Sequence, residues 1–391
     1  MAKRVGMEVS LAIGEAAMLA DVDVVAAYPI TPQTHIVEHL AELVANGKLN
    51  AAYIPVESEH SAMSACLGSS AAGARTFTAT AGQGLELMHE VLYVAASMQL
   101  PIVMTVTNRA LSAPLSVWGD HSDVMSVRDT GWIQIFAENG QDVFDNVLCA
   151  FRIAEDKNVL LPLMIHLDGF HLSHMIESII IEDQADVSKF LPPLNFPLPL
   201  DPAKPVSMGA FAPPIIYSET RKAQEENLIA SKKVISKAWD EFNQVFGRRY
   251  NPVESYRTEG AKTLLMTMGS FSETAMTTID RMRDDNQAVG LIRLRLWRPF
   301  PAEELRQAVK GIDTLVVFDR ALSLGGQAGP VCSEVRSTLY NEQHKPVVTN
   351  IVGGLGGRDI SVSDFEEIIN RGIEIAKNGR ADKSEFYGVR E

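Results

Sequence analysis

Short apolar runs alternate with segments of helical periodicity from residue 8 to about residue 175, and this alternation constrains the fold more than any other feature. Parallel strands that are buried on both faces read as near-continuous apolar runs, and they need helical crossovers between them. The pattern therefore predicts an α/β domain, a parallel sheet with helices on both faces. The expected strands are residues 23–27, 52–56, 75–80 and 101–107, and the expected helices are residues 8–20, 35–45, 59–72 and 82–98.

A proline-rich segment separates this domain from a second α/β unit. Residues 192–218 contain eight prolines, which remove too many backbone donors for a helix or a sheet interior. A long, exposed, charge-rich helix is expected over residues 219–246. We therefore expect a first domain at 1–191, an excursion and linker helix at 192–258, and a second domain at 259–391. The strands expected in the second domain are residues 263–268, 289–296 and 314–319.

Charge and cysteine content exclude several classes of protein. The 391 residues carry 35 Lys and Arg against 49 Asp and Glu, and a net charge of −14 disfavours nucleic acid and anionic membranes as partners. Three distant cysteines, in no CxxC pair, cannot supply the four thiolates of an iron–sulfur cluster and indicate a reducing compartment. No apolar stretch is long enough to span a bilayer. The N-terminal segment reads as a helix of the fold, because Glu8 and Glu15 interrupt any signal-peptide core, so we expect a cytoplasmic protein.

Three polar residues follow expected strands and are candidates for chemistry. Glu59 lies where a strand gives way to a helix, and its carboxylate could take part in catalysis or could only offset the helix dipole. Thr31 lies between two prolines, which would aim its hydroxyl consistently or would simply form a tight turn. Arg109 directly follows a strand, where ligands of open α/β sheets bind, and could hold a carboxylate or form an ordinary ion pair.

Two further segments are polar or glycine-rich without a specific motif. Residues 118–123 (WGDHSD) could form a metal or acid–base cluster, but a Gly-Asp turn with solvated neighbours is the simpler interpretation. The glycines at 82–84 and 353–357 match neither GxGxxG nor a P-loop, so we assign no nucleotide site to them.

Several ordered phrases make the chain resemble one family over nearly its whole length. It resembles the alpha subunit of multi-subunit 2-oxoacid:ferredoxin oxidoreductases, most closely the pyruvate type. The phrases that carry the resemblance are residues 28–32 (YPITP), 57–61 (ESEHS), 77–85 (FTATAGQGL), 108–113 (NRALSA), 119–123 (GDHSD), 128–131 (RDTG) and 295–300 (RLWRPF).

The resemblance implies a thiamine-diphosphate enzyme assembled from several subunits. This chain would supply a pyrimidine-binding domain and a transketolase C-terminal-like domain. A beta subunit would hold the diphosphate and its Mg²⁺, and the [4Fe-4S] clusters would also lie on partner subunits. The absence of a GDG motif with a downstream Asn, and the cysteine count, agree with this division.

The resemblance also assigns roles to the three candidates. Glu59 matches the glutamate that hydrogen-bonds a ring nitrogen of the aminopyrimidine and so favours removal of the thiazolium proton. Arg109 matches the arginine that binds the substrate carboxylate, and Thr31 matches the threonine that hydrogen-bonds the substrate. The implied reaction converts a 2-oxoacid and coenzyme A into acyl-CoA and CO₂ and reduces ferredoxin, reversibly.

Three functions compete at this stage. Pyruvate is the expected substrate, because the turn at 28–32 offers the neutral Thr31 and no second cation for a dicarboxylate, with His35 a helical turn further on. A bulkier branched-chain or aryl 2-oxoacid is the second possibility, and a non-catalytic scaffold subunit is the third. The expected partners are beta, gamma and delta subunits, ferredoxin, the 2-oxoacid and coenzyme A.

Overall fold

Seven strands form the sheet of the N-terminal unit in the computed structural model, which describes residues 2–379, 381 and 383–390. The six strands β2 to β7 run parallel, and the short β12 adds to the edge beside β6 in the antiparallel sense. The order β12-β6-β7-β5-β4-β2-β3 therefore confirms the predicted parallel α/β sheet. The strands are β2 (Val24–Ala27), β3 (Ala52–Pro55), β4 (Thr76–Thr80), β5 (Val103–Asn108), β6 (Ile133–Phe136), β7 (Leu163–Asp168) and β12 (Leu296–Arg298).

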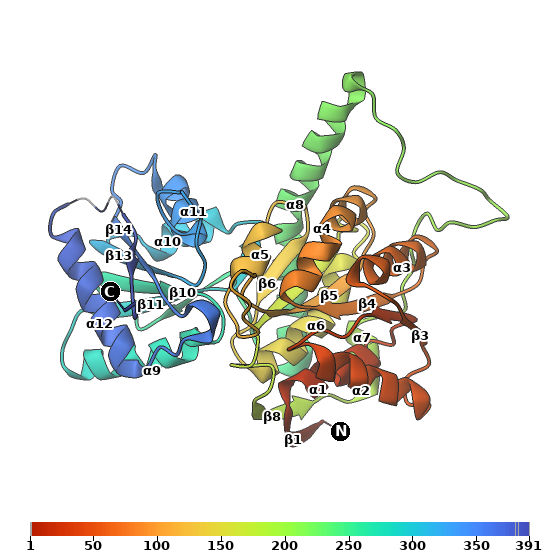
Figure 1. Ribbon diagram of the computed structural model, residues 1–391, viewed down its shortest axis with the longest axis horizontal. Coiled ribbons are helices and arrows are strands. Elements are labelled where there is room, and N and C mark those ends of the chain that lie inside the picture. Colours follow the sequence, from red (N-terminus) through yellow and green to blue (C-terminus); the bar gives the residue numbers. More distant parts are fainter. Residues whose placement is uncertain (1, 380, 382, 391) are drawn as a thin grey trace.

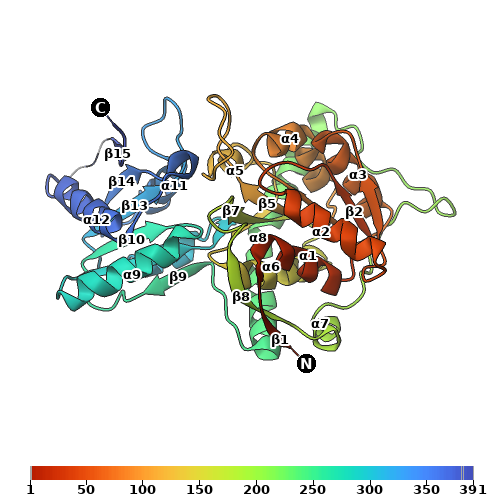
Figure 2. The ribbon, with the colours of Figure 1, turned by 60° about the horizontal axis from the view of Figure 1, so that its bottom comes forward.

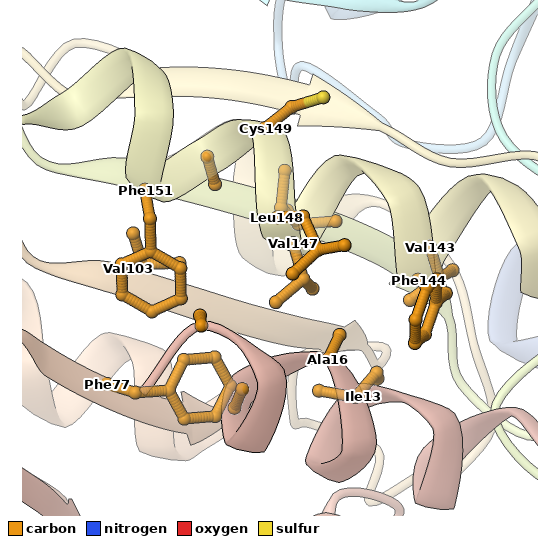
Figure 3. Packing of buried hydrophobic residues seen from close by; sticks show 14 of the residues in the cluster. Ile13, Ala16, Phe77, Val103, Val143, Phe144, Val147, Leu148, Cys149 and Phe151 are labelled. Atoms are coloured by element: carbon orange, nitrogen blue, oxygen red, sulfur yellow. The ribbon is translucent and has the colours of Figure 1, made fainter. Parts of the chain in front are cut away.

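Helices cover both faces of this sheet, as the sequence predicts (Figures 1 and 2). Successive residues of one strand point to opposite faces: Val103 joins one apolar cluster and Met104 the other. Figure 3 shows side chains of α1 and α6 closing over the first face, around Phe77 and Val103. The first face carries α1 (Val9–Leu19), α2 (Thr34–Ala45) and α6 (Gly140–Ala154), and the second carries α3 (Glu59–Ala71) and α4 (Gly82–Ser97). The short α5 (Ser122–Ser126) lies against α4, and its Val124 and Met125 join the apolar cluster of the C-terminal unit.

The extreme N-terminus differs from the prediction. Residues Lys3–Glu8 form a strand, β1, which pairs antiparallel with β8 (Ile176–Ile181), and the helix begins only at Val9. Reading the whole N-terminal segment as helix was therefore wrong. The small β1–β8 sheet continues into α7 (Gln184–Phe190). The sequence of β1 has no alternating apolar pattern that would mark it as a strand. It is stabilised by pairing with a segment more than 160 residues away, which the local sequence does not reveal.

A second sheet of six strands forms the core of the C-terminal unit, in the order β15-β14-β13-β10-β11-β9. Only β9 runs antiparallel to its neighbour. The strands are β9 (Val253–Tyr256), β10 (Thr263–Thr267), β11 (Val289–Leu294), β13 (Thr314–Asp319), β14 (Val347–Val352) and β15 (Glu385–Phe386). The helices are α9 (Phe271–Asp284), α10 (Ala302–Ala308), α11 (Pro330–Leu339), the single 3₁₀ turn η1 (Leu355–Gly357) and α12 (Val362–Ala376).

The strand predicted over residues 289–296 is two strands in two different sheets. β11 ends at Leu294 in the C-terminal sheet, and β12 then pairs with β6 of the N-terminal sheet. Arg295 between them is buried, and its guanidinium forms an ion pair with Asp142 at the start of α6. Apolar residues on both sides of Arg295 made the segment look like one strand and hid the crossing, which ties the two units together.

The linker helix α8 (Pro214–Phe246) starts earlier and is less exposed than predicted. Pro214 occupies its first turn, where a missing N–H costs nothing, so the helix begins five residues before the expected start at residue 219. Its first turns project from the body after the extended proline-rich segment (Figure 1). Its second half packs into the N-terminal core through Ile235, Trp239 and Phe242. Among the described residues, no helix is both long and apolar enough to cross a membrane.

Candidate active site

The three candidate residues meet at one edge of the N-terminal sheet. Thr31 follows β2, Glu59 follows β3 and Arg109 follows β5, while α4 starts after β4 between them. Because these strands are parallel, their carboxyl ends share an edge, the place where open α/β sheets bind ligands. The structure therefore brings together residues that the sequence separates by up to 78 positions, as the hydrogen bond from Arg109 to Thr31 shows.

Glu59 begins α3 with a carboxylate that is buried but unpartnered. Ser58 caps the helix by accepting a hydrogen bond from the Ser61 N–H, so the Glu59 side chain is not needed as a cap. Its exposed fraction is 6%, and no hydrogen bond or ion pair reaches it from the described residues. The neighbouring Thr80 hydroxyl is also buried without a partner. Two unpaired polar groups together in a buried place indicate a site for a polar ligand.

Gly84 lets this pair of side chains lie directly against the start of α4. A Cβ atom at Gly84 would lie 2.7 Å from Glu59 Oε1 and 2.6 Å from Thr80 Oγ1, closer than real contacts allow. Any side chain would therefore displace the carboxylate. Neither Thr80 nor Gly84 was singled out from the sequence, although both lie in the phrase 77–85; their signal was a glycine turn directly after a strand.

In the catalytic role that the resemblance implies for Glu59, we expect Gly84→Ala to lower turnover by about 100-fold, because a displacement of about 1 Å in a catalytic group costs that much. The matched control is Gly68→Ala in α3, where a Cβ atom would meet nothing within 4 Å. That variant should keep full activity and gain about 0.5 to 1 kcal/mol of stability, since Ala suits a helix better than Gly. Steady-state kinetics and thermal unfolding of both variants check this, and an active Gly84→Ala enzyme would contradict it.

Arg109 is a buried cation with no carboxylate on its guanidinium. Its Nε donates to the Ser116 carbonyl at 2.9 Å and its Nη1 to the Thr31 carbonyl at 3.0 Å. Only 7% of the residue is exposed, and this burial lowers the pKa of the guanidinium, which still stays charged at neutral pH. A buried charge that is held only by neutral carbonyls can accept an anion from outside the chain.

Gln33 fixes the turn that contains Thr31 through two side-chain hydrogen bonds. The Gln33 Nε2 donates to the Ala79 carbonyl at 2.6 Å, and its Oε1 accepts from the Ile30 N–H at 3.3 Å. Thr31 itself is exposed, and its hydroxyl makes no hydrogen bond with the described residues. The turn therefore presents a free hydroxyl on the same residue whose carbonyl accepts a hydrogen bond from the Arg109 guanidinium.

Asp123 joins the segments around Arg109. Its carboxylate accepts hydrogen bonds from the backbone N–H groups of Arg109 at 2.9 Å and Gly82 at 3.1 Å, and from the Asn108 side chain at 3.0 Å. Burial raises the pKa of Asp123 to about 7, against these hydrogen bonds. The interpretation of residues 118–123 as a solvated turn was therefore wrong: Asp120, His121 and Asp123 are all buried.

A buried polar cluster next to the site connects the two units. Asp168, at the end of β7, forms an ion pair with Arg320, lies 3.0 Å from His121 Nε2, and accepts from Ser270 N and Oγ at 2.8 and 2.6 Å. Burial alone would raise the pKa of Asp168, but the charge of Arg320 and the contact with His121 hold it well below the usual range. Arg320 also stacks its guanidinium 3.9 Å from the centre of the Phe271 ring.

Replacing Arg320 with Met should lower the free energy of unfolding by about 3 to 5 kcal/mol, because it leaves the buried Asp168 charge without its arginine partner. The depressed carboxyl pKa contributes stability above about pH 4 that is lost as the pH falls, so the deficit should shrink below about pH 4. Arg152→Met is the control, since Arg152 and its partner Glu241 are 23% and 32% exposed and the pair should be worth at most about 1 kcal/mol. Chemical denaturation checks both, and equal losses would contradict the assignment.

Comparison with known proteins identifies the family. A family model described as pyruvate flavodoxin/ferredoxin oxidoreductase, thiamine diphosphate-binding, matches residues 15–240, more than half of the chain. The chain belongs to this family. A second model, described as pyruvate:ferredoxin oxidoreductase core domain II, matches residues 261–365. Together the matches cover the seven-stranded sheet and strands β10, β11, β13 and β14 of the second sheet, and the first includes Thr31, Glu59 and Arg109.

Curated relatives resemble the chain over almost its full length. Pyruvate synthase subunit PorA of Methanocaldococcus jannaschii is 48% identical over 386 residues, 97% of this chain and 96% of that protein. PorA of Thermotoga maritima is 44% identical over 100% of this chain and 99% of that protein. Ketoisovalerate oxidoreductase subunit VorA of Pyrococcus horikoshii is 45% identical over 96% of this chain and 95% of that protein. Overall sequence identity thus does not distinguish relatives named for pyruvate from the relative named for ketoisovalerate.

Solved structures support the fold. The 2-oxoglutarate:ferredoxin oxidoreductase from Magnetococcus marinus aligns with a TM-score of 0.70 at 20% identity, over 95% of this chain and 65% of that chain. A split-gene transketolase aligns with a TM-score of 0.56 at 12% identity, over 95% of this chain and 99% of that chain. The chain thus spans about two thirds of the first structure. These alignments agree with the predicted pairing of a pyrimidine-binding domain with a transketolase C-terminal-like domain.

Proposed function

We propose that this chain is the alpha subunit of a heteromeric pyruvate:ferredoxin oxidoreductase that uses thiamine diphosphate. The reaction takes pyruvate, coenzyme A and two oxidised ferredoxins to acetyl-CoA, CO₂, two reduced ferredoxins and one proton, and it runs in both directions. The observation that carries the proposal is the buried Glu59 carboxylate, which has no partner among the described residues and lies beside the Thr80 hydroxyl, also without one.

The residues around Glu59 suit the aminopyrimidine ring of the cofactor. That ring has nitrogen atoms that can exchange a proton with a carboxylate, and the Thr80 hydroxyl lacks a partner beside it. When bound, thiamine diphosphate supplies the carbon nucleophile and electron sink that decarboxylation of a 2-oxoacid requires. Glu59 would hold a proton at the ring nitrogen in a nearly water-free place, which is the work of a general acid–base group. Gly84 would keep the carboxylate in this place, because a Cβ atom there would lie 2.7 Å from Glu59 Oε1.

Arg109 and Thr31 would bind the 2-oxoacid at the same edge. The Arg109 guanidinium is fixed by the Ser116 and Thr31 carbonyls, so little side-chain freedom is lost when a carboxylate arrives. The Thr31 hydroxyl can donate to a substrate oxygen beside that carboxylate. Among the described residues, no second cationic side chain contacts Arg109 or Thr31. Because a dicarboxylate such as 2-oxoglutarate would need a second cation, this favours a monocarboxylate.

A branched-chain 2-oxoacid is the second candidate substrate. The relative named ketoisovalerate oxidoreductase subunit VorA is 45% identical, within the 40% to 48% range of the PorA relatives. An added methyl group changes binding by only about 1 to 3 kcal/mol in an apolar pocket, so the same polar residues serve both acids. Pyruvate is preferred because seven relatives of 40% to 48% identity are named pyruvate synthase subunit PorA, against one named VorA.

The partners proposed are beta, gamma and delta subunits. A beta subunit would bind the cofactor's diphosphate and Mg²⁺, and partner subunits would carry the [4Fe-4S] clusters. The three cysteines of this chain suit that division, because Cys66, Cys149 and Cys332 are all free, buried and distant from one another in the sequence. Burial raises the pKa of the Cys66 and Cys332 thiols to about 12, which disfavours cluster ligation. Free thiols also support the proposed cytoplasmic location.

Co-expression of the chain with its partner subunits tests the proposal. The assembled enzyme should reduce ferredoxin with pyruvate and coenzyme A, and it should do so only when all subunits are present. We expect kcat/KM for pyruvate to exceed that for 3-methyl-2-oxobutanoate by about 10-fold or more, and turnover of 2-oxoglutarate to be negligible. Equal use of the branched acid would move the assignment to the second candidate. No turnover of any 2-oxoacid would contradict the enzymatic function.

A further inference from the structure

Two imidazoles and one carboxylate meet at a place separate from Glu59 and Arg109. Glu8 ends β1, His35 lies in the first turn of α2, and His174 lies in the loop between β7 and β8. One ligand atom from each lies within 4.8 Å of the other two, which no other set of three His, Cys, Asp or Glu achieves in the described part of the chain. His35 Nδ1 is 2.6 Å from Glu8 Oε1, and the His35 and His174 rings are 4.7 Å apart, centre to centre.

The backbone around these three side chains is fixed. The Val9 N–H donates to the Met175 carbonyl and the Ser10 N–H to the Ser173 carbonyl, each at 3.0 Å, so the segments of Glu8 and His174 are joined directly. Helices α1 and α2 lie side by side (Figures 1 and 2). A tetrahedral zinc ion holds its ligand atoms about 3.3 Å apart, given bond lengths of about 2.0 to 2.1 Å. Small rotations of the three side chains can therefore reach that geometry without moving the backbone.

A supporting hydrogen bond orients His174. Its Nδ1 lies 2.8 Å from Ser173 Oγ, and that oxygen already accepts from the Phe170 N–H at 3.0 Å. A hydroxyl oxygen has two lone pairs, so it can also accept from Nδ1–H, which leaves the Nε2 lone pair free for a metal. Histidines that bind metals are held in this way through their second nitrogen. The Phe170 ring, 4.7 Å from the His174 ring, supports the same orientation.

We propose that Glu8, His35 and His174 form a binding site for a divalent transition metal ion of the zinc class. Imidazole nitrogens favour Zn²⁺ over Mg²⁺ and Ca²⁺, which prefer oxygen ligands. The His35 side chain is 45% exposed, so an ion can enter from solvent and water can occupy the fourth position. The bound ion would join the start of α1, the start of α2 and the loop after β7. His35 lies four residues after Thr31, so the ion would also stiffen the turn at the sheet edge.

The full-length chain, free of any affinity tag, provides the test by calorimetric titration with Zn²⁺ in a non-chelating buffer. We expect one Zn²⁺ per chain, with affinity weakened at least about 10-fold in His35→Ala and in His174→Ala. The control is His39→Ala, which removes an imidazole of the same helix that pairs with Glu15 at 2.9 Å and has no second histidine beside it. This variant should bind as tightly as the wild type. No one-to-one binding by the wild type, or loss of binding in His39→Ala, would overturn the proposal.

A second measurement, on the wild type alone, does not depend on whether the variants fold. Co²⁺ should give the visible absorption of a low-symmetry, nitrogen-ligated ion, and one equivalent of Zn²⁺ should abolish it, while millimolar Mg²⁺ or Ca²⁺ should not. Absence of that absorption with Co²⁺, or its loss on adding Mg²⁺, would contradict the assignment. Neither readout uses enzymatic activity, so the result is independent of the proposed function.

Discussion

Replacing Glu59 with Gln is expected to lower kcat of the assembled enzyme by about 10² to 10⁴-fold. Glutamine keeps the volume of the side chain and fits the same space before Gly84, but its amide cannot exchange a proton with a ring nitrogen. The loss should appear in kcat rather than in KM for pyruvate, because Glu59 acts on the cofactor and not on the substrate carboxylate. Ferredoxin reduction by the reconstituted complex measures this directly.

Glu57 provides the matched control for this experiment. It precedes Glu59 by two residues, its side chain is exposed, and its carboxylate accepts a hydrogen bond from the Ser61 hydroxyl. That hydrogen bond lowers the pKa of Glu57, and no contact connects Glu57 to Gly84 or Thr80. Glu57→Gln should keep full activity. If both variants were fully active, the chain would act as a scaffold, which is the third function that the sequence leaves open.

Replacing Arg109 with Leu should raise KM for pyruvate by about 100-fold or more, with a smaller change in kcat. Each hydrogen bond to a charged group contributes about 1.5 to 3 kcal/mol, and a carboxylate would accept two from the guanidinium. Arg109→Lys should recover only part of the affinity, since one ammonium group cannot donate in the same fork. Initial rates over a range of pyruvate concentrations separate the two constants.

The Arg109 side chain also holds the Thr31 carbonyl, so the variants need a structural check. The melting temperature should fall by a similar amount in the Leu and Lys variants, while KM should differ between them. The control variant Arg152→Met removes a partly exposed arginine that pairs with Glu241 far from the sheet edge, and it should leave KM unchanged. An unchanged KM in Arg109→Leu would contradict the substrate-binding role.

The sequence predicts the framework of the site better than its details. Strand ends place Thr31, Glu59 and Arg109 at one sheet edge, because parallel topology puts all carboxyl ends together. Thr80 and Gly84 were not predicted as site residues. A glycine is required at position 84 only because side chains of other elements lie against it. Such a contact between α3 and α4 has no local signature in the sequence.

Long-range polar pairing explains most of the errors. Residues 118–123 look solvated because three of them are charged or ionisable, yet Asp168 and Arg320 on other segments bury His121. Arg295 likewise looks like one position of a continuous strand, although its ion pair with Asp142 marks a crossing between two sheets. Burial of a charge depends on a partner far away in the chain, and hydrophobic periodicity does not report that partner.

An experimental structure of the assembled complex with thiamine diphosphate would test the central claim most directly. The proposal predicts a Glu59 carboxylate oxygen within about 3.2 Å of a pyrimidine ring nitrogen, with the diphosphate on the neighbouring subunit. A cofactor bound elsewhere, or a Glu59 side chain that faces water while the cofactor is present, would contradict it.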